Sequence, residues 1–484
     1  MVSKADLVRV GEFVWEVPKG YRGDMRVPAR IYADEQLLDM AFRDSTMEQL
    51  VNTAALPGVV KHVLVMPDAH QGYGLPIGGV VATRYPDGVI SPGGVGYDIN
   101  CGVRLMASRI VADDVRDEMK GLISALFRNI PSGVGKGGGA RRVSAREMDR
   151  VLVKGAAWAV KEGYGRQEDL ERLEEDGSMA GADPSAVSPR AKERGGPQLG
   201  TLGSGNHFIE VQQVEEIFDD KAARAFGLFQ GQLALSIHSG SRGLGHQVCS
   251  DYVKDLQSAV HKYNIQLPDR QLVCAPMSSP EGRRYFGAMV SAANYAWANR
   301  QCMAHLARRS FEEVLAGKVR DFDLRTVYDV AHNIAKIEDH VVDGKQTKLI
   351  VHRKGATRAF GPGHREVASV YRDVGQPVLV PGDMGTASYV LVGTDDAMDA
   401  SFGSSCHGAG RTMSRTAAKK KIHGGTLRRE LEERGIQVRA GSLAGLAEEA
   451  PEAYKDIDAV VAVVQGAGLA RMVARLRPLA VMKG

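Results

Sequence analysis

Short apolar runs rich in Val, Ile and Leu recur along the chain, and turn-forming residues follow each of them. Runs of this length and composition predict strands. They occupy residues 62–66, 79–83, 233–238, 349–352, 377–380 and 459–464. Three longer stretches predict helices, because their apolar residues recur three and four positions apart or because they are dense in charge. These stretches are residues 111–129, 283–315 and 426–435.

The expected strands and helices do not alternate at the spacing of about 30 residues that a regular βαβ array requires. A length of 484 residues would allow roughly two to four domains. The mixed order of elements instead favours an α+β fold in which strands and helices surround a single large core over residues 1–484. Residues 174–200 are polar and rich in Pro, Gly and Ser, and they predict a surface loop within that core.

The composition is that of an ordinary globular protein, with 44% apolar and 25% charged residues. It excludes a coiled coil, a collagen-like chain and a mostly disordered chain. Glycine is abundant, with 56 residues gathered in short clusters, which indicates tight turns where the backbone approaches a ligand. The net charge is only +4, so a nucleic-acid partner would have to be met by local basic patches.

Five cysteines are spread along the chain without CxxC spacing, which favours reduced thiols and a cytoplasmic protein. The N-terminal residues lack the apolar stretch of a secretory signal. The longest apolar run, residues 459–464, is far shorter than the roughly 20 residues of a membrane-spanning helix. We therefore expect a cytoplasmic protein that makes no membrane contact.

Candidate metal ligands lie beside glycine or asparagine in several loops. Asp98 and Cys101 are three residues apart in SPGGVGYDINCGVRL, a segment too rich in glycine for a helix. A carboxylate and a thiolate together suit a borderline divalent ion. The alternative is a turn capped by Asp98 beside a buried, structural Cys101.

Three histidines occupy similar positions: His207 in LGSGNHFIE, His238 in LSIHSGSRGLG and His332 in YDVAHNIAK. Each alone could be an ordinary hydrogen-bonded histidine. Together with Asp98 and Cys101 they supply enough ligands for a two-ion site with a bridging thiolate. Two neighbouring ions suit phosphate chemistry, because they neutralise charge on both sides of a displacement at phosphorus.

The segment SSCHGAGRTMSR places His407 before a Gly-Ala-Gly turn and an expected helix. Five basic residues and no acidic ones lie between His407 and His423. Backbone N–H groups in such a turn can bind a phosphate. An ordinary solvated basic helix face explains the charges equally well.

Eight motifs together resemble the RtcB-type RNA ligases. In chain order they are MPDAHQGYGLPIGG, GGVGYDINCGVRL, GSGNHF, HSGSRGLG, DVAHNIAK, VHRKGATRAFGPG, PGDMGTASYVL and CHGAGRTMSR, and the resemblance extends from residue 66 to the C-terminal end. It implies a ligase that uses GTP and two Mn²⁺ ions to join RNA 3′-phosphate or 2′,3′-cyclic phosphate ends to 5′-hydroxyl ends. The implied route passes through a guanylyl-histidine and an RNA-3′-ppG intermediate, in tRNA splicing or RNA repair.

The same resemblance implies roles for individual residues. His407 would be the guanylylated nucleophile, and Asp68 an essential acidic residue. Asp98, Cys101 and His207 would bind one Mn²⁺, and Cys101, His238 and His332 the other. The implied guanylate site comprises Asn206, His207, Phe208, Ile209, Glu210, His332, Asn333, Pro381, Gly382, Asp383, Met384, Ser388, His407, Gly408, Ala409, Gly410, Tyr454 and Lys483. Asp383 departs from the serine that many members of the family carry at this position.

The implied partners are GTP, RNA such as broken or intron-excised tRNA halves, and an archease-type activator. Lys483 would read the guanine, and the apolar residues 479–482 before it favour a docked tail over a free one. Two other classes remain open on the residues alone. One is a metal-dependent phosphodiesterase or phosphatase that uses the same ions without a covalent histidine, and the other is a non-catalytic RNA-binding protein. The ligand types also suit Zn²⁺ or Co²⁺.

Overall fold

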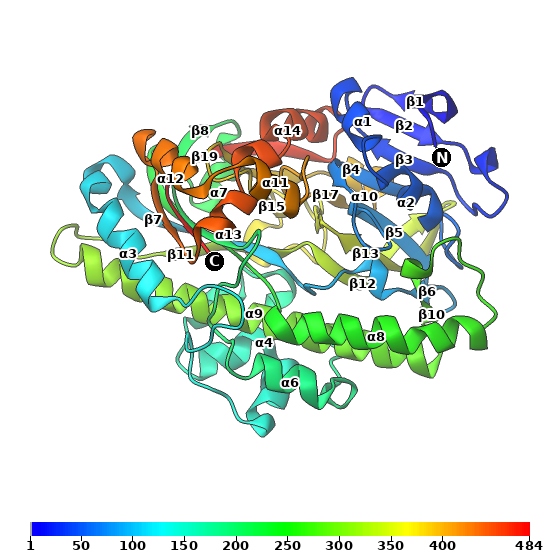
Figure 1. The fold of residues 1–484 in the computed structure, drawn as a ribbon, viewed down its shortest axis with the longest axis horizontal. Coiled ribbons are helices and arrows are strands. Elements are labelled where there is room, and N and C mark those ends of the chain that lie inside the picture. The colour runs from blue at the N-terminus through cyan, green and yellow to red at the C-terminus, as the bar shows by residue number, and fades with distance from the viewer. Residues whose placement is uncertain (1) are drawn as a thin grey trace.

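Two large β-sheets dominate the α+β fold of this computed structural model, which describes residues 2–484 (Figure 1). The seven-stranded sheet has the order β1 (Val8–Gly11), β2 (Val14–Val17), β3 (Ala29–Tyr32), β4 (Val63–His70), β5 (Ile77–Arg84), β13 (Lys345–Lys354) and β12 (Asn333–Val342). The eight-stranded sheet has the order β11 (Arg325–Ala331), β7 (Gly102–Val111), β9 (Gln232–Ser239), β8 (Phe208–Ile217), β19 (Ala470–Lys483), β16 (Ser388–Gly393) and β15 (Pro377–Val380), and β18 (Gln437–Ala440) pairs with β19.

Two short ribbons supplement the large sheets. They pair β6 (Val89–Ile90) with β10 (Ala275–Pro276), and β14 (Ala356–Arg358) with β17 (Ser404–Cys406). The chain passes from the eight-stranded to the seven-stranded sheet at His332, the residue between β11 and β12. Side chains from both large sheets can therefore meet at this passage.

The longest helix, α9 (Pro280–Leu315), lies beside α8 (Arg242–Lys262) below the two sheets (Figure 1). Ser279 caps it by accepting a hydrogen bond from the Gly282 N–H, and Pro280 occupies the first turn, where a missing N–H costs nothing. α9 also packs against α4 (Ala145–Lys161) and α3 (Met119–Asn129). The remaining α-helices are α1 (Glu35–Ala41), α2 (Thr46–Thr53), α5 (Gln167–Leu170), α6 (Pro189–Gly195), α7 (Asp220–Phe226), α10 (Asp396–Ser401), α11 (Arg415–Lys421), α12 (Gly424–Glu433), α13 (Leu443–Glu448) and α14 (Ile457–Gly466).

Most of the expected elements are confirmed. Five of the six expected strands lie in β4, β5, β9, β13 and β15. The stretches 283–315 and 426–435 correspond to α9 and α12. The stretch 111–129 consists of a 3₁₀ segment (Ala112–Glu118), which is kinked at Val115, followed by α3.

The strand expected at residues 459–464 is wrong, because this run lies in α14. Asp456 caps the helix by accepting a hydrogen bond from the Asp458 N–H. The helix packs between β4 and β19, so its apolar residues are buried on more than one side. A short run that is apolar all round does not distinguish a buried helix from a buried strand.

The surface loop expected at residues 174–200 is also corrected. The segment contains 3₁₀ turns at Glu174–Gly177 and Pro184–Ala186 and the helix α6, and several of its side chains are buried. The Glu174 carboxylate accepts hydrogen bonds from Lys336 Nζ and the Ala331 N–H, both at 2.7 Å. The polar composition predicted a surface loop, whereas the polar residue Glu174 is buried and its ion pair attaches the segment to the core.

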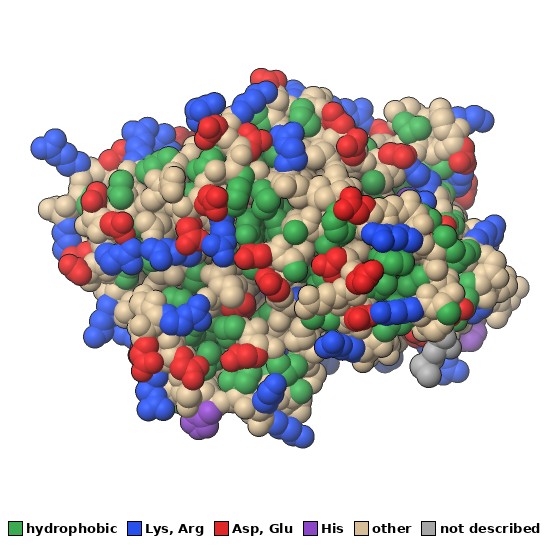
Figure 2. Space-filling view, turned by 90° about the horizontal axis from the view of Figure 1, so that it is seen from above, with side chains coloured by type: hydrophobic (Ala, Val, Ile, Leu, Met, Phe, Trp, Pro, Cys, Tyr) green, Lys and Arg blue, Asp and Glu red, His purple; other side chains and the backbone are tan. Residues whose placement is uncertain are grey.

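Among residues 2–484, no helix combines the length and the apolar character that crossing a bilayer would require. Basic and acidic side chains are interspersed over the face shown in Figure 2. This distribution agrees with the small net charge and leaves any anion-binding role to local clusters.

A buried ion cluster connects α9 to the ends of three strands. The Arg300 guanidinium donates to the Asn100 carbonyl at 2.8 Å, the Ser239 carbonyl at 2.9 Å and the Asp329 carboxylate at 2.7 Å. Arg104 donates to the same carboxylate at 2.8 Å. The side chains of Arg104, Arg300 and Asp329 are all 0% exposed. Burial raises the pKa of Asp329, but the two guanidiniums outweigh it and hold the pKa below its ordinary value.

Asp329→Asn should destabilise the protein by about 3–5 kcal/mol, because it leaves two buried guanidiniums without a counter-charge. Urea unfolding followed by circular dichroism would measure the loss. The difference from wild type should be largest near neutral pH. It should shrink as the pH falls below about 3.9, since a carboxylate with a lowered folded pKa stabilises only while ionised.

The matched control is Glu313→Gln, which removes the partner of Arg128 from a pair whose side chains are 49% and 57% exposed. Its cost should stay below about 1 kcal/mol. Equal costs for the two variants would contradict the structural role assigned to the buried cluster.

Candidate active site and metal centre

The five expected metal ligands lie where strands of the eight-stranded sheet begin or end. Asp98 and Cys101 precede β7, and His207 precedes β8. His238 lies near the end of β9, and His332 follows β11. Antiparallel pairing places these ends side by side, because β7 pairs with β9 and β11, and β8 pairs with β9. The sheet therefore gathers at one edge five side chains that are distant in the sequence.

Backbone hydrogen bonds between these loops hold the turn that carries Asp98 and Cys101. Asn100 adopts a left-handed conformation with φ of 52°, and its N–H donates to the Asn333 carbonyl at 2.7 Å. The Asn333 amide donates in turn to the Asp98 carbonyl at 3.1 Å. The His332 N–H donates to the Cys101 carbonyl at 2.9 Å. The turn is therefore fixed from the passage between the two sheets.

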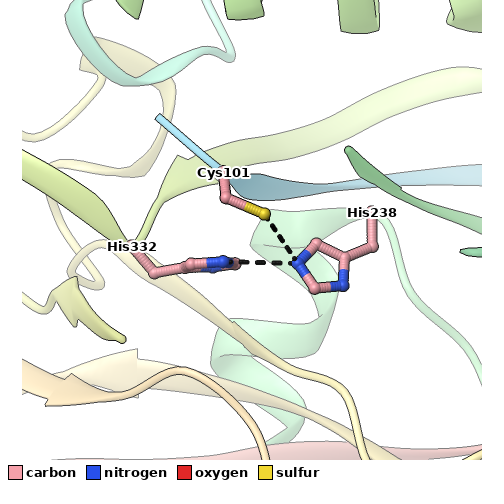
Figure 3. Close-up of side chains that lie close together, drawn as sticks. All are labelled: Cys101, His238 and His332. Carbon is pink, nitrogen blue, oxygen red and sulfur yellow. Dashed lines mark hydrogen bonds between the residues drawn. The ribbon is translucent and has the colours of Figure 1, made fainter. Parts of the chain in front are cut away.

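The ligand atoms form two groups that share one sulfur. Cys101 Sγ lies 3.3 Å from His238 Nε2, which lies 3.3 Å from His332 Nε2 (Figure 3). Cys101 Sγ also lies 3.3 Å from His207 Nε2, which lies 2.8 Å from Asp98 Oδ2. Within each group the ligand atoms lie within 4.8 Å of one another. These are the two ligand sets that the family resemblance implies, with Cys101 common to both.

The chemistry of these donors suits divalent ions. The His207 Nδ1 atom lies 3.0 Å from the Leu202 carbonyl, an arrangement that favours the tautomer with its Nε2 lone pair toward Cys101. Burial lowers the pKa of His238 and His332 well below the ordinary value, so both are neutral, as ligands must be. Burial raises the pKa of the Cys101 thiol, and a bound cation would offset this by stabilising the thiolate.

The spacing of the ligand atoms agrees with this assignment. Metal–ligand bonds of about 2.0–2.3 Å in a tetrahedral site hold neighbouring ligand atoms about 3.5 Å apart. His238 Nε2 lies 3.3 Å from Cys101 Sγ and 3.3 Å from His332 Nε2, and both distances are close to that separation. The cluster can therefore hold a metal ion without large rearrangement.

His407 lies beside the metal ligands and is oriented by a buried carboxylate. Its ring centroid is 4.9 Å from that of His332. The Asp68 Oδ2 atom accepts hydrogen bonds from His407 Nδ1 at 2.6 Å and from the His407 N–H at 3.0 Å. Asp68 is 0% exposed, and Lys455 Nζ fixes the backbone on both sides of it by donating to the Pro67 and Ala69 carbonyls. With the proton on Nδ1 shared with Asp68, the His407 Nε2 atom carries the free lone pair.

A cavity of about 190 Å³, called here the His407 pocket, opens beside this histidine. Fifteen of the eighteen residues implied for a guanylate site line it. They are Asn206, Phe208, Glu210, His332, Asn333, Pro381, Gly382, Asp383, Met384, His407, Gly408, Ala409, Gly410, Tyr454 and Lys483.

Three implied residues occupy other places. His207 lies in the metal cluster. Ile209 is 0% exposed and packs in the core, because alternation along β8 turns it away from the side of Phe208 and Glu210. Ser388 Oγ accepts a hydrogen bond from Gln212 Nε2, which also donates to Glu210, so Ser388 lies one side chain behind the pocket.

The C-terminal strand brings Lys483 into the pocket. Lys483 is the last residue of β19, pairs with Phe208 of β8, and is only 5% exposed. The docked tail expected from residues 479–482 is thereby confirmed. Burial raises the pKa of Glu210 and lowers that of Lys483, while the attraction between unlike charges opposes both effects.

The Asp383 carboxylate is bound within its own turn, to the Gly385 N–H at 2.7 Å and the Thr386 hydroxyl at 2.8 Å.

A larger cavity of about 1110 Å³, called here the outer groove, adjoins the His407 pocket and shares Ile77, Asn206, Asn333 and Arg415 with it. Lys136, Arg194 and Arg242 line the groove as well as Asp98 and His207. The metal cluster thus lies where the two cavities meet. Lys136 belongs to the glycine-rich segment 131–139, whose place beside the site was not apparent from its sequence.

Comparison with known proteins identifies the family. The model of the RtcB family, described as tRNA-splicing ligase RtcB, matches residues 49–484. The chain belongs to the RtcB family. It is 57% identical over 484 residues to the tRNA-splicing ligase RtcB of Thermococcus kodakarensis, covering 100% of both chains. It is 56% identical over 478 residues to that of Archaeoglobus fulgidus, covering 99% of both chains.

Cys101→Ala should remove or strongly deplete two bound divalent ions from this RtcB-family protein, because its sulfur belongs to both ligand groups. Asp98→Ala should affect one ion more than the other. Metal analysis after reconstitution with Mn²⁺ and gel filtration would measure the stoichiometry.

Cys249→Ala is the matched control, since Cys249 is a buried free cysteine on α8 outside the ligand groups. Its metal content should equal that of wild type. A Cys101→Ala protein that retains two ions would contradict the shared-sulfur arrangement.

Proposed function

We propose that this protein is an RNA ligase that uses GTP and Mn²⁺ to join RNA 3′-phosphate or 2′,3′-cyclic phosphate ends to 5′-hydroxyl ends. The proposed setting is tRNA splicing or RNA repair in the cytoplasm, with an archease-type activator as a partner. The observation that carries the proposal is the position of His407, oriented by Asp68, between a two-group metal cluster and a pocket. Membership of the RtcB family supports the same activity.

The proposed first step is attack by His407 Nε2 on the α-phosphorus of GTP. An N–P bond forms, the bond to the bridging oxygen breaks, and pyrophosphate leaves. Asp68 holds the Nδ1 proton and stabilises the positive charge that the ring acquires. The alternative, a metal-dependent phosphodiesterase, requires no covalent histidine, whereas the Asp68–His407 pair agrees with one.

The guanylyl group then passes from His407 to the RNA 3′-phosphate, which frees the imidazole. The 5′-hydroxyl of the second RNA attacks the activated phosphate, and GMP leaves. Bound divalent ions would neutralise phosphate charge during these displacements. Gly410 lines the pocket, its φ is 77°, and an added Cβ would lie 2.0 Å from the Asp68 carbonyl. Only glycine permits this close approach.

Guanine would occupy the opposite end of the pocket. An ammonium donor at Lys483 pairs with O6 of guanine, whereas the N6 amino group of adenine would leave it without an acceptor. The Glu210 carboxylate would accept from guanine N1 and N2. Both side chains line the pocket, and both are nearly fully buried, so solvent would not replace a missing contact.

RNA would lie in the outer groove. Arg194, Arg242 and Lys136 supply a local basic patch there that the overall charge does not. The rings of Tyr97 and His246, also in the groove, stack with centroids 5.7 Å apart and offer a face for a base. Asn206 and Arg415 belong to both cavities, where an RNA end would meet the guanylylated histidine.

His407→Ala should abolish the acid-labile protein adduct formed with α-labelled GTP and Mn²⁺. Asp68→Asn should slow its formation by about 100-fold or more, because an amide disfavours the tautomer that frees Nε2. Denaturing gels of protein quenched over time would give both rates. His423→Ala, the same change 16 residues away at the start of α12, should label like wild type. Adduct formation by His407→Ala would remove His407 from the nucleophile role.

Lys483→Met should lower the preference for GTP over ATP in adduct formation by about tenfold or more, since a buried unpaired donor no longer penalises adenine. The substitution keeps the β19 backbone pairing and adds no charge, so metal content should stay at the wild-type level. Competition between the two labelled nucleotides would measure the ratio. An unchanged ratio would show that the terminal strand does not read the base.

A further inference from the structure

A buried carboxylate that belongs to no recognised motif lies at the end of the His407 pocket where Lys483 emerges. Glu449 follows α13, and its side chain is 0% exposed. It contacts Arg411 Nη1 at 3.2 Å, Arg415 Nε at 3.3 Å and Lys483 Nζ at 3.9 Å. It also accepts a hydrogen bond from the Tyr454 hydroxyl.

These partners come from separate parts of the chain. Arg411 follows the His407 loop, Arg415 begins α11, and Lys483 ends β19. One carboxylate thus joins the segment that carries the nucleophile to the C-terminal strand. The Arg411 guanidinium also lies over the Tyr454 ring, 5.0 Å from its centroid. Tyr454 lines the pocket, so this part of the lining contacts the same cluster around Glu449.

The charges at this point are unequal, with three cations around one carboxylate. Burial raises the pKa of Glu449, but Lys483, Arg411 and Arg415 outweigh it and hold the pKa below its ordinary value. Glu449 is therefore ionised. Burial lowers the pKa of Lys483, and Glu449 is the largest influence that raises it again. Without this carboxylate, Lys483 would lose its ion pair with Glu449, and only Glu210 would remain to oppose the effect of burial on its charge.

We propose that Glu449 is a positioning residue that holds the Lys483 ammonium toward the base in the His407 pocket and thereby sets the preference for guanine over adenine. The inference rests on the proposed use of GTP. A lysine side chain has four rotatable bonds, and an ion pair made before the nucleotide arrives removes most of the ordering cost from the binding step. The Phe208 ring, 5.5 Å from Lys483 Nζ, limits the side chain from another direction.

The test is Glu449→Gln, which keeps the shape and removes the charge. Single-turnover adduct formation would be measured against the concentration of GTP, ATP and inosine triphosphate. The half-saturating GTP concentration should rise about tenfold, and the maximal rate should stay within about twofold, as for a contact made equally in the ground and transition states. The GTP-to-ATP preference should fall about tenfold.

Inosine triphosphate distinguishes the proposed base contact of Lys483 from that of Glu210. It keeps the O6 atom that faces Lys483 and lacks the N2 group that faces Glu210. If Glu449 acts through Lys483, the preference for GTP over inosine triphosphate should be the same in Glu449→Gln as in wild type. A fall in that ratio equal to the fall in the GTP-to-ATP ratio would overturn the proposal, because it would indicate a general disturbance of the pocket.

Glu448→Gln is the matched control, one residue earlier, where the carboxylate pairs with Lys419 at 2.7 Å and lies 4.0 Å from Arg415 Nε. Its nucleotide preference should equal that of wild type. Glu449→Asp retains the charge with a shorter reach and should give an intermediate GTP-to-ATP ratio, and this variant decides the question if Glu449→Gln does not fold.

Two further results would overturn the inference. One is an unchanged GTP-to-ATP ratio in Glu449→Gln or, if that variant does not fold, in Glu449→Asp. The other is a loss of maximal rate together with thermal stability while that ratio is constant, which would assign Glu449 a structural role only. A wild-type protein that forms no adduct with GTP would instead refute the proposed function, so the two failures are distinguishable.

Discussion

The ion cluster of Arg300, Asp329 and Arg104 is the constraint on which the site depends. Arg300 reaches from the centre of α9 to the Asn100 and Ser239 carbonyls, each one residue from a metal ligand. Asp329, which it also binds, lies three residues before His332. A guanidinium is stable in a dry interior only while its donors are paired. The strand ends therefore cannot shift without exposing that charge, and the metal ligands are held before any ion binds.

The fold places the metal ligands beside the Asp68–His407 pair. Metal ligands come from the edge of the eight-stranded sheet, and Asp68 comes from β4 of the seven-stranded sheet. His332 lies between the sheets, 3.3 Å from the His238 ligand atom and with its ring 4.9 Å from that of His407. A phosphate bound beside His407 would thus lie next to the metal cluster, which is the geometry that transfer of a nucleotidyl group requires.

Much of this arrangement could be predicted from the sequence, and the exceptions have physical causes. Apolar runs with turn residues located β4, β5, β9, β13 and β15, but the same signal misassigned α14, whose apolar residues are buried on several sides. Polar composition hid the buried pairing of Glu174 with Lys336. Ligand types indicated a metal, whereas their convergence depends on strand pairing across the whole chain. Glu449 went unnoticed because only its three-dimensional surroundings distinguish it from other acidic residues.

In the proposed reaction, His407, oriented by Asp68, forms the covalent bond to the nucleotide. The most direct measurement is mass spectrometry of the protein after incubation with GTP and Mn²⁺, with digestion under conditions that preserve phosphoramidate bonds. We expect a single GMP group on the peptide that contains His407, with fragment ions that assign it to that residue. A GMP group on a lysine or on another histidine, or ligated RNA formed without any protein adduct, would contradict it.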